Sequence, residues 1–243
     1  MEKIDIPLDF NIGDIGFDAG EVDLTAFDFS ANIADEIETR YIKPPPPRQI
    51  KKKNIRYEYA QQLAQDLDIG EGTRHMALVS GNFIFGDFIE ALFVAKNIHT
   101  KRLQISTLSM SQENIDSLAN LMNGGFVDSL DLIVSAYFYA HERGKGGLIP
   151  YLHKTLDKDN SLQIAVAGIH TKVVTFETDG GKCITMHGSA NLRSSRCVEQ
   201  VMIEEGRELF QFFTDMNESI LKQYSTIKKE VRASKLWEAM NEH

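Results

Sequence analysis

Two short stretches of the chain combine a nucleophile with hydrogen-bond donors. His170 and Lys172 are two residues apart in a run rich in Val, Thr and Phe, and Gly-Ser-Ala-Asn follows at 188–191. Residues two apart on a strand point to the same face, so the run predicts an imidazole beside a fixed cation. The Asp-Gly-Gly-Lys segment between the stretches is typical of a hairpin turn, which would bring Ser189 and Asn191 back to this pair.

This set of side chains is suited to holding and attacking a phosphate. An ammonium, an amide N–H and a hydroxyl all donate hydrogen bonds to oxyanions, and backbone N–H groups near Gly188 would add donors. His170 is the nucleophile or proton carrier of the group. Each stretch alone is more often an ordinary solvated strand or loop, whereas the two in this order predict a phosphate site.

The constellation resembles the sequence signature of the phospholipase D superfamily, which runs His-x-Lys, four residues, Asp, six residues, Gly-Ser-x-Asn. His170, Lys172 and the 188–191 segment match it. Glu177 occupies the Asp position, and ten residues rather than six follow it, which a longer hairpin absorbs. Glu199 fits the acidic residue that the family usually has on the next strand. The resemblance implies a catalytic group of His170, Lys172, Glu177, Ser189, Asn191 and Glu199.

The resemblance also implies a mechanism and an assembly. In this superfamily one histidine attacks phosphorus to give a phosphohistidine, a second protonates the leaving oxygen, and water resolves the intermediate, without metal or other cofactor. Because the chain has one His-x-Lys signature, a complete site requires two copies around a twofold axis. We therefore expect a homodimeric hydrolase, a metal-independent phosphodiesterase similar to small endonucleases that act on DNA or RNA.

Two other functions share this site chemistry. A catalytically weak or inactive relative would keep the phosphate pocket as a nucleic-acid-binding module, and Glu177 together with the long hairpin favours that alternative. A lipid phosphodiesterase fits less well, because the sequence has no evident amphipathic membrane-facing helix.

A second stretch with charged side chains is His-Glu-Arg-Gly-Lys-Gly-Gly at 141–147. It follows a predicted strand at its carboxyl end, where the ligand sites of α/β proteins gather. Its glycines permit a mobile loop. Arg143 and Lys145 are therefore candidates for substrate binding, although an ordinary solvated loop has the same composition.

The remaining sequence predicts the scaffold of the site. Apolar strand patterns alternate with helical patterns from 76 to 167, which is typical of βαβ units, and the returning hairpin makes the sheet mixed. We expect a phospholipase D-like α/β domain over 57–221, with a mixed, mostly parallel sheet covered by helices on both faces, and a C-terminal helix over 222–243. The expected strands are 76–80, 103–108, 130–138, 162–167, 169–177, 183–186 and 199–203, and the expected helices are 57–67, 85–97, 111–122, 147–156 and 208–221.

The net charge of −9 comes from the N-terminal part of the chain. Residues 1–40 hold eleven acidic and two basic residues, so the remaining chain is neutral. Acids interleaved with Phe and Gly, without a sustained period, predict a disordered arm, which either binds a protein partner, mimics nucleic acid or acts as a solubilising tail. Residues 41–56 are predicted to be a Pro-rich basic linker, whose cations either contact nucleic-acid phosphates or pair with the arm.

Composition limits the remaining possibilities. The chain has 243 residues, 42% of them hydrophobic, which is enough for one sizeable core. Its two cysteines, Cys183 and Cys197, do not suggest a disulfide framework, and no apolar signal segment follows Met1. No apolar run reaches the roughly 18 residues that span a bilayer. We therefore expect a cytoplasmic protein without a membrane segment.

Overall fold

The fold is known from a computed structural model, which describes residues 51–57, 59–80, 83–158, 160–193 and 197–224. The predicted acidic arm, the proline run of the linker and most of the predicted C-terminal helix lie outside these residues. Residues 222–224, the described part of that helix, continue the preceding helix.

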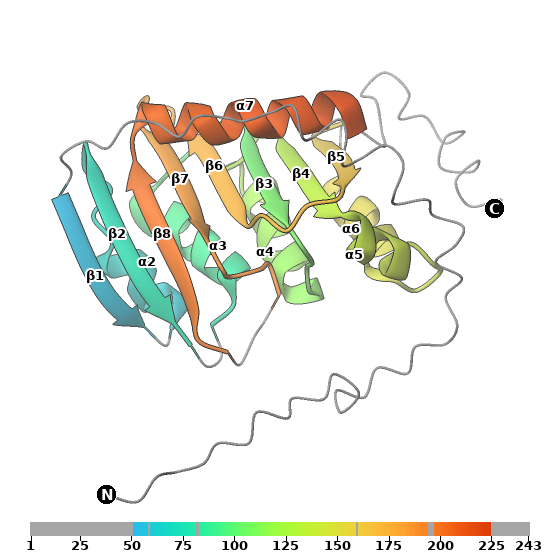
Figure 1. Ribbon diagram of the computed structural model, residues 1–243, viewed down its shortest axis with the longest axis horizontal. Coiled ribbons are helices and arrows are strands. Elements are labelled where there is room, and N and C mark those ends of the chain that lie inside the picture. The colour runs from blue at the N-terminus through green and yellow to red at the C-terminus, as the bar shows by residue number, and fades with distance from the viewer. Residues whose placement is uncertain (1–50, 58, 81–82, 159, 194–196, 225–243) are drawn as a thin grey trace, which may run out of the picture. The chain divides into compact units, whose positions relative to one another are not determined.

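Strands within the described residues form one mixed sheet. They are β1 (Lys51–Tyr57), β2 (Thr73–Val79), β3 (Leu103–Thr107), β4 (Leu130–Ser135), β5 (Leu162–Ala167), β6 (Val173–Glu177), β7 (Cys183–Gly188) and β8 (Glu199–Glu205). Their order across the sheet is β1-β2-β8-β7-β6-β3-β4-β5 (Figure 1). The pairs β1–β2, β3–β4 and β4–β5 are parallel and the other four are antiparallel. Only β6 and β8 of these strands are reversed, so the predicted mixed α/β sheet is confirmed. It is less parallel than predicted, because each reversed strand makes antiparallel pairs with both of its neighbours.

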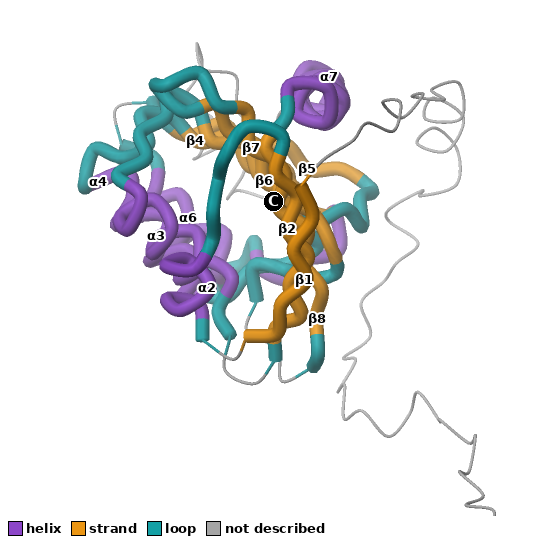
Figure 2. The backbone as a smooth tube through the Cα atoms, turned by 90° about the vertical axis from the view of Figure 1, so that its left-hand side faces the viewer, coloured by secondary structure: helices purple, strands orange, loops and turns teal. Residues whose placement is uncertain are grey.

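Helices cover both faces of this sheet, but unequally. They are α2 (Ala60–Asp66), α3 (Phe85–Lys96), α4 (Gln112–Asn123), α5 (Ala136–Glu142), α6 (Leu148–Leu156) and α7 (Arg207–Tyr224). Figure 2 shows α2, α3, α4 and α6 on one side of the strands, whereas α7 lies on the other. There α7 contacts β3 to β7. None of the helices in the described ranges is long and apolar enough to cross a bilayer.

The main hydrophobic core lies between the sheet and the first group of helices. Phe88 and Phe93 on α3 are completely buried, and the Phe93 ring lies 4.7 Å from the ring of Phe176 on β6. Burying one such side chain contributes about 1.5–3 kcal/mol. Packing of the helices on this apolar face holds the strands of the sheet in place, and with them the residues at the strand ends.

The structure corrects the predicted start of the domain. Residues 51–56, assigned to the linker, belong to β1, which pairs in parallel with β2 from Lys51–Thr73 to Tyr57–Val79. The run of lysines resembles a solvated linker, but a strand at the edge of a sheet also accommodates lysines. The folded domain therefore includes residues 51–57.

Two predicted strands are shorter than expected. The strand predicted over 130–138 ends at Ser135, whose Oγ accepts a hydrogen bond from the Phe138 N–H at 3.0 Å and so caps α5. The strand predicted over 169–177 begins only at Val173. The predicted helices 85–97 and 111–122 agree with α3 and α4 to within one or two residues.

Candidate active site

The motif residues meet at one edge of the sheet. The carboxyl end of β7 and the amino ends of β6 and β8 lie there, beside the carboxyl ends of the remaining strands. His170 and Lys172 precede β6, Ser189 follows β7, and Glu199 begins β8. Because these three strands are neighbours, the predicted hairpin return is confirmed. The fold brings the two polar stretches of the sequence together.

The ammonium of Lys172 is in contact with His170. Its Nζ lies 3.1 Å from His170 Nδ1 and donates to the His170 carbonyl oxygen at 2.9 Å. An ammonium has no acceptor lone pair, so Nδ1 is the acceptor, and the neutral imidazole carries its proton on Nε2. Burial lowers the pKa of Lys172 below its ordinary value, and the nearby charge of Glu199 partly offsets this shift by raising it.

The Ser189 hydroxyl is held by the first residues of β8. Its oxygen accepts a hydrogen bond from the Gln200 N–H at 3.0 Å, and its O–H donates to the Glu199 carboxylate. The Ser189 N–H donates in turn to the Gln200 carbonyl oxygen at 3.0 Å. The hydroxyl therefore positions Glu199 beside Lys172, and its proton is already engaged before a phosphate binds.

Gly188 lets β7 and β8 approach each other next to the motif. A Cβ atom at this position would lie 2.0 Å from the Gln200 carbonyl oxygen, far inside van der Waals contact. The Gly188 N–H also donates to the Lys172 carbonyl oxygen at 3.3 Å. Gly188 thus contacts both the segment that carries Lys172, through this hydrogen bond, and the start of β8, through the close approach of the two strands.

Asn191 lies in the segment that runs from β7 toward β3. The following residue, Leu192, donates its N–H to Thr107 Oγ1 at 3.3 Å and accepts from the Ser111 N–H at 2.8 Å. Asn191 Oδ1 is buried and has no hydrogen-bond partner among the residues that the structure describes. A buried polar atom of this kind is best explained by water or a ligand, so Asn191 is suited to contact a bound molecule.

The end of β3 anchors both motif segments, which the sequence analysis missed. Thr171, between the motif His and Lys, donates from Oγ1 to Ser106 Oγ at 3.0 Å, and Thr107 holds Leu192. Ser106 and Thr107 are each 1% exposed. The sequence signal for them was a pair of hydroxyl residues at the carboxyl end of a predicted strand.

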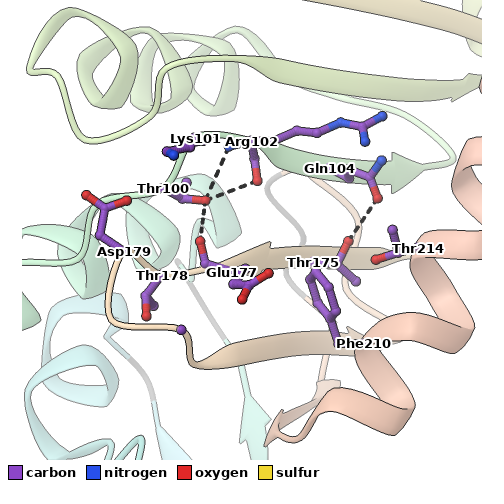
Figure 3. Close-up of a pocket in the computed structure, with 11 residues that line it drawn as sticks. Thr100, Lys101, Arg102, Gln104, Thr175, Glu177, Thr178, Asp179, Phe210 and Thr214 are labelled. Atoms are coloured by element: carbon purple, nitrogen blue, oxygen red, sulfur yellow. Dashed lines mark hydrogen bonds between the residues drawn. The ribbon is translucent and has the colours of Figure 1, made fainter.

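Glu177 does not join this group, so its assignment to the catalytic set is wrong. It ends β6 at the opposite edge of the sheet, which places it roughly 17 Å from Lys172 along five residues of extended chain. Its carboxylate pairs with the Arg207 guanidinium at 3.2 Å. Figure 3 shows it in a pocket beside Thr100 and Asp179. A fixed spacing in sequence becomes a long distance when the intervening residues form a strand.

Arg143 and Lys145 occupy exposed positions after α5, the helix that begins at the carboxyl end of β4. The loop predicted over 141–147 is shorter than expected, because α5 extends to Glu142. Its remainder is a closed turn, in which the Gly147 N–H donates to the Gly144 carbonyl oxygen at 2.9 Å and Glu142 Oε2 accepts from the N–H of the first residue of α6 at 2.9 Å. The two cations therefore project from a compact turn.

Removing the Lys172 ammonium should weaken the binding of anions. A hydrogen bond to a charged group contributes about 1.5–3 kcal/mol, so Lys172→Ala should lower the affinity for sulfate by roughly 10- to 100-fold. In the wild type, the affinity for sulfate should fall as the pH rises through the pKa of Lys172. Because this pKa is lowered, the fall should occur at a lower pH than for an ordinary lysine. Glu199→Gln removes the charge that raises this pKa and should move the fall to still lower pH. Calorimetric titration with sulfate across a pH series measures both effects.

Lys182→Ala is the matched control for this prediction. Lys182 lies beside the hairpin turn at the opposite edge of the sheet and donates from Nζ to the Ile69 carbonyl oxygen at 2.8 Å. Its removal should leave sulfate affinity unchanged. An equal loss in the two variants would mean that sulfate responds to overall charge and not to the motif.

Comparisons with known proteins find only distant similarity. The sequence matches no protein-family profile and no curated protein. Among solved structures, NucT from Helicobacter pylori has 14% sequence identity and a TM-score of 0.44, over 63% of this chain and 98% of its own. NUC from Salmonella typhimurium, a phospholipase D family member, has 12% identity and a TM-score of 0.40, over 52% of this chain and 81% of its own. Phosphatidylserine synthase from Haemophilus influenzae Rd KW20 has 15% identity and a TM-score of 0.44, over 75% of this chain and 49% of its own. Similarity at this level carries no argument for function, which rests on the side chains of the site.

Proposed function

We propose that this protein is a metal-independent phosphodiesterase that cleaves nucleic acid through His170. The contact between the Lys172 ammonium and the His170 ring is the observation that carries the proposal. It places a nucleophile and a fixed positive charge at one point of the sheet edge. Phosphoryl transfer needs this combination of an attacking group and charge stabilisation.

The hydrogen bond between Lys172 and His170 suggests how the site responds to substrate. The non-bridging oxygens of a phosphodiester compete for the ammonium, because hydrogen bonds between charged groups are stronger than one to a neutral ring. Once Nδ1 is released, the exposed imidazole can carry its proton there and present a lone pair on Nε2. Nε2 then attacks phosphorus, the bond to the leaving oxygen breaks, and water later cleaves the phosphorus–nitrogen bond.

The leaving oxygen needs a proton, which we assign to His170 of a second copy of the chain in a twofold homodimer. A histidine donates a proton as the imidazolium, which carries protons on both ring nitrogens. In the free site Nδ1 accepts from Lys172 and Nε2 carries the ring proton, so the second ring becomes the acid by taking up a proton on Nδ1 once phosphate has drawn the ammonium away. Nε2 of this imidazolium then gives its proton to the leaving oxygen while the other histidine attacks, and the ring returns to its neutral form. The dimer supplies both roles from a single motif.

Exposed side chains on and after α5, which begins at the carboxyl end of β4, support nucleic acid as the substrate. Arg143 and Lys145 project from the turn after α5 and would contact backbone phosphates. On α5 itself the ring of Tyr137 is 56% exposed and lies 4.1 Å from the ring of His141, so it is held by a neighbour and open on its other side. An exposed ring of this kind can stack with an unpaired base.

Dilution tests the homodimeric site directly. If both histidines come from a twofold dimer, hydrolysis of a single-stranded oligonucleotide should persist in EDTA, and specific activity should fall when the protein is diluted below its dimer dissociation constant. Sedimentation velocity at the same concentrations measures the dimer fraction, and the two curves should coincide.

Two outcomes would contradict this function. A monomer at every concentration with undiminished specific activity would exclude a shared site. Oligonucleotide binding that is lost in Lys172→Ala, without any hydrolysis by the wild type, would identify a nucleic-acid-binding module.

A further inference from the structure

A row of polar side chains crosses the sheet on the face that α7 covers. Directly paired residues of neighbouring strands form it, so their side chains point to the same side. Arg74 at one end of the row is partly exposed, and every other member is at most 9% exposed. Buried positions are usually apolar, so a continuous polar row has to be explained. The row is Arg74, Glu204, Thr185, Thr175, Gln104, Asp131 and Gln163.

Ion pairs neutralise the row on both sides of its centre. Arg74 pairs with Glu204 on one side, and Arg102 pairs with Asp131 on the other. The hydrogen bonds in the part of the row between the two ion pairs are long. Gln104 Nε2 donates to Asp131 at 3.3 Å, and the Thr175 hydroxyl donates to Gln104 Oε1 at 3.4 Å. The centre of the row is therefore neutral and weakly bonded.

Several buried polar atoms in this layer have no partner among the described residues. They are Oγ1 of Thr185, Oγ1 of Thr214 and both amide atoms of Asn217. Thr185 and Asn217 are 0% exposed. Thr214 and Asn217 are three positions apart on α7, which places them on one side of the helix. Buried polar atoms are costly to leave unpaired, so these groups call for water or a ligand.

A pocket of about 600 Å³ opens onto this layer (Figure 3). Gln104, Thr175 and Thr214 supply polar groups to its wall, and the Phe210 ring supplies an apolar surface. Its charged lining residues are two cations and two anions, Lys101 and Arg102 with Glu177 and Asp179, so it has no net charge. The volume is within the range of small-molecule sites.

We propose that this pocket binds a neutral, planar heterocycle with amide groups, that is, a nucleobase or nucleoside. Each polar atom of the Gln104 amide makes one long internal hydrogen bond, which leaves one N–H and one oxygen lone pair side by side for the edge of a base. The Thr214 hydroxyl supplies a further donor or acceptor, and Phe210 supplies a ring for stacking. The site lies at the edge of the sheet opposite His170, since Glu177 lines it, and it is separate from the catalytic group.

Binding of the four ribonucleosides to the full chain tests the proposal. Saturation-transfer NMR should detect at least one of them, and calorimetry should give its dissociation constant. Thr214→Val keeps the shape of the side chain but removes the hydroxyl, and Phe210→Leu removes the ring, so each should weaken that nucleoside by roughly tenfold. His170→Ala should bind it as the wild type does.

Phe212→Leu is the control for Phe210→Leu. It removes a ring from the same helix that contacts Phe213 at 5.1 Å and is not part of the pocket wall. It should leave nucleoside affinity unchanged. Absence of binding by all four nucleosides at millimolar concentration would overturn the proposal. Binding that is lost in His170→Ala but kept in Thr214→Val would also overturn it, by assigning the nucleoside to the catalytic site.

Discussion

Replacement of His170 by alanine should abolish phosphodiester hydrolysis and leave the fold intact. The side chain is exposed and precedes β6, so its loss removes no core contact. Without the imidazole no phosphohistidine forms, and the expected loss of rate is roughly 10⁴-fold or more, as for other essential nucleophiles. Initial rates on a single-stranded oligonucleotide in EDTA give the loss, and urea unfolding checks that the free energy of unfolding is unchanged.

His99→Ala is the matched control. His99 is partly exposed and lies at the opposite edge of the sheet, next to Thr100, which makes an isolated β-bridge with Val127. Its ring stacks on Phe126 at 5.0 Å, and its Nδ1 lies 3.0 Å from the Gly125 carbonyl oxygen. This variant should hydrolyse at the wild-type rate. Hydrolysis by His170→Ala at a comparable rate would exclude the phosphohistidine mechanism and direct attention to another nucleophile.

Replacement of Gly188 by alanine should destabilise the protein by about 3 kcal/mol or more, at the upper end of overpacking effects. The added Cβ would lie 2.0 Å from the Gln200 carbonyl oxygen, which belongs to the backbone of a central strand and cannot rotate away. Native domains are stable by only about 5–15 kcal/mol, so the loss should be large in urea unfolding. Separation of β7 from β8 would also displace Ser189, so activity should fall even where the variant remains folded.

Gly180→Ala separates this steric effect from a general effect of replacing glycine. Gly180 is in the turn between β6 and β7, and a Cβ there would meet only Thr178 Oγ1, at 3.7 Å. Its free energy of unfolding should stay within about 0.5 kcal/mol of the wild type. Equal stability of the two variants would show that the spacing of β7 and β8 does not depend on Gly188.

The local elements were predictable because their patterns are periodic over many residues. The helix predicted over 85–97 is α3 (Phe85–Lys96), and the strand predicted over 162–167 is β5 with the same bounds. Pairing between distant strands has no such local signal. The polar row beneath α7 was therefore missed, because each strand contributes only one of its members, such as Gln104 or Thr175, and only the pairing of the strands aligns them.

The candidate site was predictable in its core and not in its periphery. His170, Lys172 and Ser189 are brought together because a hairpin joins their segments, and hairpins leave a local sequence signal. Glu177 was included by its place in a motif, and five residues of strand carry it to the far edge. The support from Ser106 depends on β3 lying beside β6, a neighbour relation that sequence spacing does not encode.

The position of β8 determines when the molecule becomes complete during folding. It is the last strand of the sheet along the chain, yet it lies between β2 and β7. Until it is in place, β1 and β2 form one ribbon, β7, β6, β3, β4 and β5 form another, and each has an open edge that can pair with other chains. Closure joins residues as distant as Val79 and Glu199, which makes it a slow step. Because Glu199 begins β8, the carboxylate beside Lys172 arrives only with this closure, so a nascent chain should gain a working site at the moment when the open edges of β2 and β7 disappear.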